Sequence, residues 1–271
     1  MRWRTFVLTE KKRRYFKFTL GVGVIMAVVL AGIIKSGYLA ENEFEPVTHG
    51  NLNKAQVALA CNVFWGEEFL PAMLAVLKEE EVKTTFFVGG SWAKKNEVLV
   101  KAIVEDGHEI GNHTYSHPHP NNLSSEQNKE QILQTEKLLA EIAGVKTRLY
   151  APPYGEYNKN VLTAAHEIGY TTVMWTIDTI DWQRPSAEVI QRRVLDKLQN
   201  GAIILIHPTK PTLEALPGLI KEIKSKGYSV STVSGILKVG QLTVKGRPDP
   251  AFFYCPVSKF MVVLYLHNAC S

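Results

Sequence analysis

The chain has 271 residues, of which 45% are hydrophobic and 21% are charged. These proportions are typical of a globular protein and exclude a wholly disordered or low-complexity chain. Its three cysteines, Cys61, Cys255 and Cys270, are too few and too scattered for a disulfide framework or a structural zinc cluster.

The net charge of +5 comes from the N-terminus. Residues 1–17 hold seven basic side chains and one acidic side chain, a local charge of +6, so residues 18–271 together carry −1. A nearly neutral body excludes a protein that binds nucleic acid by neutralising many phosphates. We expect no nucleic-acid partner.

The basic cluster precedes residues 18–34, which carry no formal charge. A signal-peptide core runs about 7–15 residues, whereas a spanning helix needs about 17–25. Tyr38 stands at position −3 if Ala40 ends the leader, so the small residue that a cleavage site requires is missing. Basic residues before this segment and glutamates after it place the N-terminus in the cytoplasm. We therefore expect an uncleaved single-pass anchor in the cell membrane, with the rest of the chain extracytoplasmic.

Short apolar runs alternate with amphipathic ones from residue 56 onward, and no G-x-G-x-x-G motif follows the first run. The pattern predicts an α/β fold, a TIM-like (β/α)7 barrel of parallel strands. Strands are expected at 56–63, 83–88, 108–112, 147–151, 170–176, 202–207 and 228–233, and helices at 68–80, 92–105, 125–142, 158–168, 187–199 and 213–226. Expected helix N-caps are Ser91, Ser124 and Ser186. The predicted organisation is a cytoplasmic segment (1–17), an anchor (18–36), a linker (37–55), the barrel (56–236) and an atypical tail (237–271).

Polar residues follow several of the predicted strands, where parallel barrels gather their functional groups. His113 and His117 are four residues apart, a spacing that can bring both rings to one metal ion. His207 is a candidate general acid, with Asp178 or Asp181 available to orient it. Trp65, Tyr154 and Trp182 could stack on sugar rings or be plain packing residues.

At these positions the chain resembles the polysaccharide deacetylase family (NodB homology, carbohydrate esterase 4) over roughly residues 55–236. Residues 107–118, Gly-His-Glu-Ile-Gly-Asn-His-Thr-Tyr-Ser-His-Pro, are similar to its metal-binding motif. Asp181-Trp182 and Leu205-Ile206-His207 are similar to its fourth and fifth motifs. The resemblance is greatest to a sporulation-associated branch of spore-forming Firmicutes.

The resemblance implies a metal-dependent hydrolase that removes N-acetyl groups from cell-wall amino sugars, with peptidoglycan as the expected glycan. It implies a divalent ion, zinc or else cobalt or manganese, held by His113 and His117. His207 would be the acid, Asp181 its tuner, and the Tyr154 backbone amide the oxyanion donor. The expected substrate contacts are Trp65, Pro153, Tyr154, Trp182 and Leu205.

The first motif of the family departs from this pattern. The family has Thr-Phe-Asp-Asp, which supplies the base and a third ligand, whereas residues 60–63 read Ala-Cys-Asn-Val. Asn62 is thus a degenerate base position, because an amide cannot accept a proton at neutral pH. Ala151 also replaces an arginine of the third motif.

Two hypotheses follow from these departures. The chain is a deacetylase with a rearranged base, for which Glu67, Glu68, Asp178 and His119 are candidates. Alternatively, it is an inactive, membrane-tethered glycan-binding relative that acts in cell-wall or spore formation.

Overall fold

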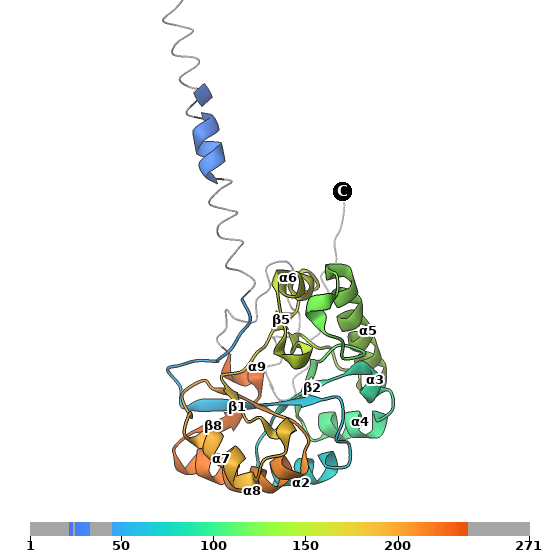
Figure 1. Cartoon of the computed structure of the whole chain (residues 1–271), viewed down its shortest axis with the longest axis vertical. Coiled ribbons are helices and arrows are strands. Elements are labelled where there is room, and N and C mark those ends of the chain that lie inside the picture. The colour runs from blue at the N-terminus through green and yellow to red at the C-terminus, as the bar shows by residue number, and fades with distance from the viewer. Residues whose placement is uncertain (1–21, 24, 33–44, 238–271) are drawn as a thin grey trace, which may run out of the picture.

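The computed structural model describes residues 22–23, 25–32 and 45–237 (Figure 1). Residues 22–23 and 25–32 are helical. Among the residues described, no helix is both long and apolar enough to cross a membrane. The predicted anchor at 18–36 is only partly covered, and the predicted cytoplasmic segment and all but the first residue of the predicted tail lie outside the described residues.

The domain is built on one parallel sheet of eight strands, in the order β5-β4-β3-β2-β1-β7-β6, with β8 paired to β1 outside this path. The sheet curls, but within the described chain no strand pairing joins β5 to β6. The strands are β1 (Gln56–Val63), β2 (Thr85–Val88), β3 (Glu109–Asn112), β4 (Leu149–Tyr150), β5 (Thr171–Thr172), β6 (Ile177–Asp178), β7 (Ile203–Ile206) and β8 (Ser229–Ser231).

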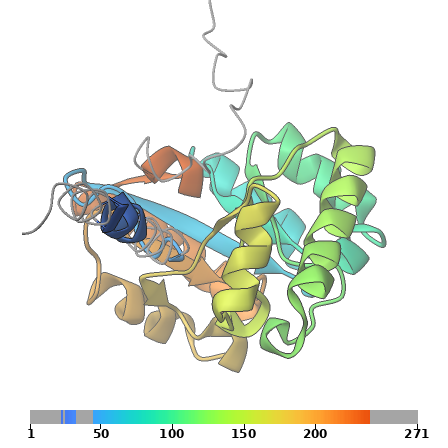
Figure 2. The same ribbon diagram turned by 90° about the horizontal axis from the view of Figure 1, so that it is seen from above.

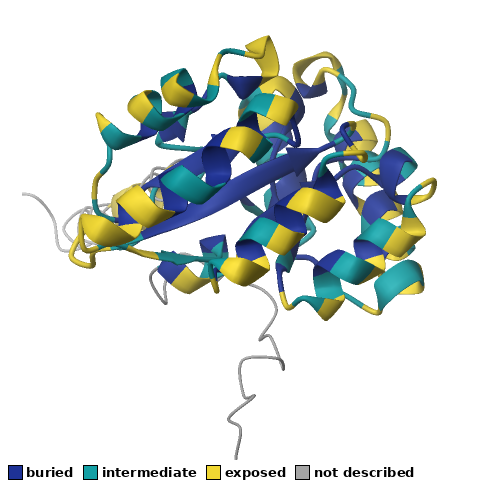
Figure 3. Ribbon diagram, turned by 90° about the horizontal axis from the view of Figure 1, so that it is seen from below, coloured by how far each residue is buried: buried dark blue, intermediate teal, exposed yellow. Residues whose placement is uncertain are grey.

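Helices surround the sheet (Figure 2) and expose mainly their outer faces (Figure 3). They are α2 (Leu70–Glu79), α3 (Gly90–Ala93), α4 (Glu97–Glu105), α5 (Ser125–Ala143), α6 (Lys159–Glu167), α7 (Ala187–Leu195), α8 (Lys210–Ser225) and α9 (Val233–Ile236). Three 3-10 turns, η1 (Pro120–Asn122), η2 (Pro153–Gly155) and η3 (Asp181–Gln183), follow strands or precede helices.

Strand β1 is the centre of the sheet because it pairs with β2, β7 and β8. Its side chains alternate between two apolar clusters, as the twofold period of a strand requires. Cys61 and Val63 belong to the large cluster that includes α2 and α8, whereas Ala58 and Ala60 belong to the cluster on the other face. Burial raises the pKa of the Cys61 thiol well above its ordinary value, so this thiol stays protonated at neutral pH.

The expected parallel α/β architecture is confirmed, but the expected count of seven strands is wrong. The predicted strand at 170–176 ends early, because β5 pairs with β4 while the following residues cross to another partner. Ile177 and Asp178 form a separate strand against β7. The sequence pattern showed one apolar run here, since it cannot show which neighbour each half of the run pairs with.

Helix starts are predicted with mixed success. Ser124 accepts a hydrogen bond from the Gln127 N–H, and the Gln127 side chain accepts one from the Ser124 N–H, a complete capping box. Ser186 is the N-cap of α7 by position, without a side-chain capping bond. Ser91 is not a cap, because it lies inside α3 and α4 begins later, after Asn96.

Residues 45–55, assigned to the linker by sequence, make backbone contacts with the domain. Val47 bridges Val173, and His49 bridges Ala202. The Val47 N–H donates to the Thr172 carbonyl and the Met174 N–H donates to the Val47 carbonyl. This segment therefore lies beside β5 and β7, near the part of the sheet that strand pairing leaves open.

A buried histidine lies at the start of β3, at the opposite end of the sheet from the predicted site. His108 Nδ1 accepts a hydrogen bond from the Thr84 N–H (3.2 Å), and its Nε2 is enclosed without a partner in the described structure. Burial first, and then the charge of Lys83, lower the pKa of His108 to about 4. The folded domain therefore holds this imidazole neutral.

We expect His108→Asn to reduce the sensitivity of the domain to acid, because the amide oxygen can replace Nδ1 as acceptor but does not titrate. An unfolded histidine titrates near pH 6.5, so the contribution of neutral His108 is complete above that pH and is lost as the pH falls toward 4. Between about pH 7 and pH 5, the wild type should lose about 1–2 kcal/mol more unfolding free energy than the variant. Urea unfolding at both pH values measures this difference, and equal losses would contradict it.

Candidate functional site

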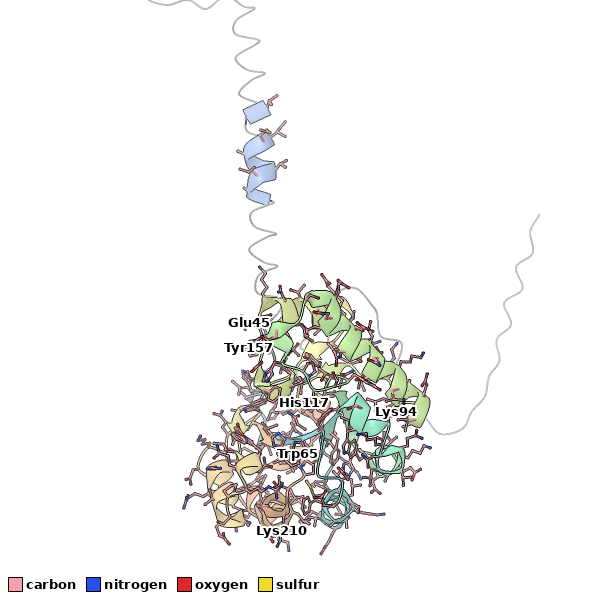
Figure 4. All side chains as sticks on the ribbon, turned by 45° about the vertical axis from the view of Figure 1, so that its right-hand side comes forward. Glu45, Trp65, Lys94, His117, Tyr157 and Lys210 are labelled. Atoms are coloured by element: carbon pink, nitrogen blue, oxygen red, sulfur yellow. The ribbon has the colours of Figure 1, made fainter. Side chains whose placement is uncertain are left out.

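The predicted site residues gather at the carboxyl ends of the strands. Asn62 lies near the end of β1, His113 directly follows β3, Ala151 follows β4, and His207 follows β7. Asp181 begins η3, three residues after β6. In Figure 4, Trp65 and His117 both lie toward the middle of the domain.

His207, whose side chain is 16% exposed, forms a hydrogen-bonded pair with the fully buried Asp181. The His207 backbone N–H donates to Asp181 Oδ2 (2.6 Å), and its Nδ1 bonds Oδ1 (2.7 Å). Because a carboxylate only accepts, Nδ1 carries the proton and Nε2 is left as the reactive nitrogen. The Thr212 hydroxyl donates to Asp181 Oδ2 (2.6 Å). We call these three residues the acid group.

Thr212 was missed by the sequence analysis. Helix α8 was predicted to begin at 213, but it begins at Lys210, with Thr209 as the N-cap that accepts from the Thr212 N–H. The signal was available in the sequence as Thr-Lys-Pro-Thr, since proline favours the first helical turn after a capping threonine. A helix that starts here places Thr212 directly beneath Asp181.

His113 and His117 lie together in a tight loop after β3. Their ring centroids are 5.0 Å apart, and the His117 backbone is left-handed (φ 56°). Asn112 holds the loop: its Oδ1 accepts from the Thr114 N–H (3.0 Å), and its Nδ2 donates to the Ile132 carbonyl (2.8 Å). The His113 Nδ1 bonds the Ala151 carbonyl (2.7 Å), so its Nε2 is left for a ligand.

Both imidazoles are neutral at physiological pH. Burial first, and then His117, lower the pKa of His113 to about 3, although its bond to Ala151 opposes the shift. Burial first, and then the charges of His207 and His119, lower the pKa of His117 to about 4, although a bond to its own backbone opposes the shift. Neutral imidazole is the form that binds metal ions.

The described residues do not fit a three-ligand metal site, because they contain no group of three or more histidine, cysteine, aspartate or glutamate side chains that could hold an ion. Val63, at the position of the third ligand, is fully buried in the apolar cluster that contains Cys61. Two imidazoles alone are fewer than the three protein ligands of a catalytic zinc site.

Asn62, at the position where the resemblance implies the catalytic base, carries an amide and not a carboxylate. It is 6% exposed, and its Oδ1 is enclosed without a hydrogen-bond partner in the described structure. Ala151, at the position of the family arginine, is also buried.

The proposed replacements for the base are engaged elsewhere or exposed. Glu67 accepts from the Trp92 indole N–H (3.2 Å), and Asp178 accepts from the Ile180 N–H (2.8 Å) in its own turn. His119 bonds Glu156 (3.1 Å) and stacks on Tyr154 (4.1 Å between ring centroids). Glu68 is exposed, and no hydrogen bond or ion pair joins its side chain to the described residues.

Of the residues predicted to contact sugar, three have exposed aromatic rings and two are buried. Trp65, Trp182 and Tyr154 are 36%, 52% and 58% exposed, whereas Pro153 and Leu205 are buried. Trp65 stacks on His207 (5.8 Å between ring centroids), and the Tyr154 ring meets His117 edge to face (4.6 Å). Tyr154 has a left-handed backbone (φ 58°), and the role of its amide stays a prediction.

We expect Thr212→Val to lower the unfolding free energy by about 1–3 kcal/mol, because a charged acceptor loses a buried donor. Asp181→Asn should cost more, and the double variant should cost less than the sum, since both changes act on one network. Urea unfolding measures all three variants. Thr163→Val on α6, whose hydroxyl makes no hydrogen bond in the described structure, is the matched control. Additive losses would contradict the network.

The chain is similar to known proteins of one family. The family model for polysaccharide deacetylase matches residues 49–173. The uncharacterized protein YlxY of Bacillus subtilis is 45% identical over 210 residues, 78% of this chain and 66% of YlxY. A peptidoglycan-N-acetylglucosamine deacetylase of Bacillus cereus is 38% identical over 197 residues, 71% of this chain and 72% of that enzyme. The chain thus spans slightly less than two thirds of the length of YlxY.

Solved structures include a pseudoenzyme. BA3943 of Bacillus anthracis, a CE4 family pseudoenzyme, matches with a TM-score of 0.71 at 40% identity, covering 74% of this chain and 71% of that one. A BA3943 mutant with restored enzymatic activity matches with the same TM-score at 39% identity, covering 74% of each chain. The resemblance inferred from the motifs is confirmed: the chain belongs to the polysaccharide deacetylase family, the CE4 carbohydrate esterases.

Proposed function

We propose that this protein binds N-acetylated cell-wall glycan, most simply peptidoglycan, and deacetylates it extremely slowly or not at all. The proposal is supported mainly by the residues at the carboxyl ends of the strands. Asn62 and Val63 stand where the family has two aspartates, and the described residues hold no three-ligand metal group.

Two losses act against turnover. General-base catalysis contributes about 10²–10⁴-fold, and the Asn62 amide cannot supply it. The metal ion on which the deacetylases of this family depend lacks a protein ligand here, and Glu67, Asp178 and His119 are held by other partners. Neither loss removes the exposed rings of Trp65, Tyr154 and Trp182.

Glycan binding is supported by what the site keeps. Trp65, Tyr154 and Trp182 present exposed rings near the two histidines and the acid group, and rings of this kind stack on sugars. The named Bacillus cereus relative is a peptidoglycan-N-acetylglucosamine deacetylase. The pseudoenzyme status of BA3943 supports a fold retained without turnover.

We also propose that the domain is held at the outer face of the cell membrane. Residues 1–17 carry the basic cluster and residues 18–34 carry no formal charge. A chain anchored in this way would meet the cell wall with its domain, as the glycan-binding proposal needs.

The second candidate is an active deacetylase with a rearranged base. The intact acid group favours it, because Asp181 holds Nδ1 of His207 and leaves Nε2 as the nitrogen that can donate a proton when the imidazole is charged. This candidate predicts metal-dependent acetate release that His207→Ala abolishes. Glycan binding without turnover predicts no acetate release and binding that survives the same substitution.

We expect Asn62→Asp with Val63→Asp to raise acetate release by about 10²-fold or more over the wild type, because the pair returns a base and a ligand. Acetate is measured with the full chain, added zinc or cobalt, and N-acetylglucosamine oligomers. Asn53→Asp with Val98→Asp, two exposed positions away from the strand ends, is the matched control.

His207→Ala in the restored variant should remove the gained activity. Circular dichroism must show that each variant is folded, since Val63→Asp places a carboxylate in a buried position. If the wild type already releases acetate as fast as the restored variant, the proposal of slow or absent turnover is wrong.

A further inference from the structure

Asn62 is the most unusual polar residue of the site. Only 6% of the residue is exposed to solvent. Its Oδ1 is enclosed without a partner, and no hydrogen bond joins either end of the amide to the described residues. Buried polar groups are nearly always paired. The Nδ2 of Asn62 is unpaired but is not among the enclosed atoms, so it is the end of the amide that a ligand in the site can reach.

The position of Asn62 directs this amide toward the site. Ala58 and Ala60 precede it on the same side of β1 and belong to the inner apolar cluster with Ala151. In register, Cys61 pairs with Ile206 and Asn62 pairs with Phe87, so the next residue of the β7 chain beside Asn62 is His207. The amide therefore lies on the side of β1 that faces the cluster containing Ala151, beside His207 in the strand register.

The chemistry of an amide selects its ligand. A carboxamide offers both N–H donors and a carbonyl acceptor, and either end can be presented by a half-turn of the side chain. The acetamido group of an N-acetylated sugar offers the complementary pair, one N–H and one carbonyl. A de-N-acetylated sugar carries an ammonium instead, which only donates and needs a carboxylate or several acceptors.

Three carboxylates near the site already accept hydrogen bonds, and Glu68, which accepts none in the described structure, is exposed to solvent. Asp181 is fully buried and already accepts three hydrogen bonds from His207 and Thr212. Asp178 accepts from its own turn, and Glu67 accepts from Trp92. An ammonium placed beside Asn62 would therefore lose water without gaining a counter-ion.

We propose that Asn62 makes this protein a reader of N-acetylation: its amide hydrogen-bonds the acetamido group, so the chain binds acetylated glycan in preference to the deacetylated form. This inference rests on the proposed glycan binding and names the chemical group that is read. In this proposal, position 62 recognises the glycan instead of acting as a base. The asparagine amide has nearly the shape of an aspartate carboxylate, and its hydrogen-bonding groups are complementary to those of an acetamido group.

The test is calorimetric titration of the full chain with an N-acetylglucosamine tetramer and with the glucosamine tetramer, in the presence of a chelator that prevents metal-dependent turnover. We expect the wild type to bind the acetylated tetramer at least about tenfold more tightly, since a site that pairs with a ligand group rejects the analogue lacking it. Asn62→Ala should reduce the preference to about threefold or less.

Asn62→Asp provides a second variant of nearly unchanged shape. The carboxylate loses the donors and attracts the ammonium, so the preference should move toward the glucosamine tetramer. Asn53→Asp, the same chemical change at an exposed position in the turn before β1, should leave the preference as in the wild type.

The outcomes separate the two proposals. Equal wild-type affinity for both tetramers, or a preference that Asn62→Ala leaves unchanged, overturns the reading of N-acetylation while glycan binding stands. If neither tetramer binds, both proposals fail. A preference lost in Asn62→Ala and moved toward the glucosamine tetramer in Asn62→Asp supports both.

Discussion

The pairing of β1 with three other strands is the constraint on which the site depends. It fixes the strand within the sheet and places Asn62 beside Phe87 of β2 and beside His207, which follows β7. Because parallel strands end at one edge, the chemistry of the site is decided by what each strand carries at its last residues. A change of two side chains at the end of β1 can thus alter function while the fold stays intact.

The residues around Asp181 are joined by hydrogen bonds, whereas Asn62 and Ala151 are not. Asp181 is satisfied by His207 and Thr212 in a buried network, and removing any member would leave a charge or a donor unpaired. Asn62 and Ala151 form no such network. A family arginine left at position 151 without its carboxylate would be a buried unpaired charge, so losing both together costs the fold little.

The order of strands and helices along the chain, and the site residues at the strand ends, could be predicted from the sequence. Both depend on local pattern: alternating apolar runs, and polar residues where each run ends. The two separate strands that replace the predicted strand at 170–176 could not be predicted. The first pairs with β4 and the second with β7, and the periodicity of the sequence does not encode which strands lie next to each other. The same is true of Thr212, which acts through a carboxylate thirty-one residues away. The unpaired state of the Asn62 amide is likewise visible only in three dimensions.

The central claim is that this member of the family holds acetylated glycan without converting it. Native mass spectrometry of the full chain, incubated with zinc and an N-acetylglucosamine tetramer, observes binding and conversion in one sample. The account predicts a complex whose bound tetramer keeps all its acetyl groups throughout the incubation. Release of tetramer lighter by one or more acetyl groups, in wild type but not in His207→Ala, would contradict it.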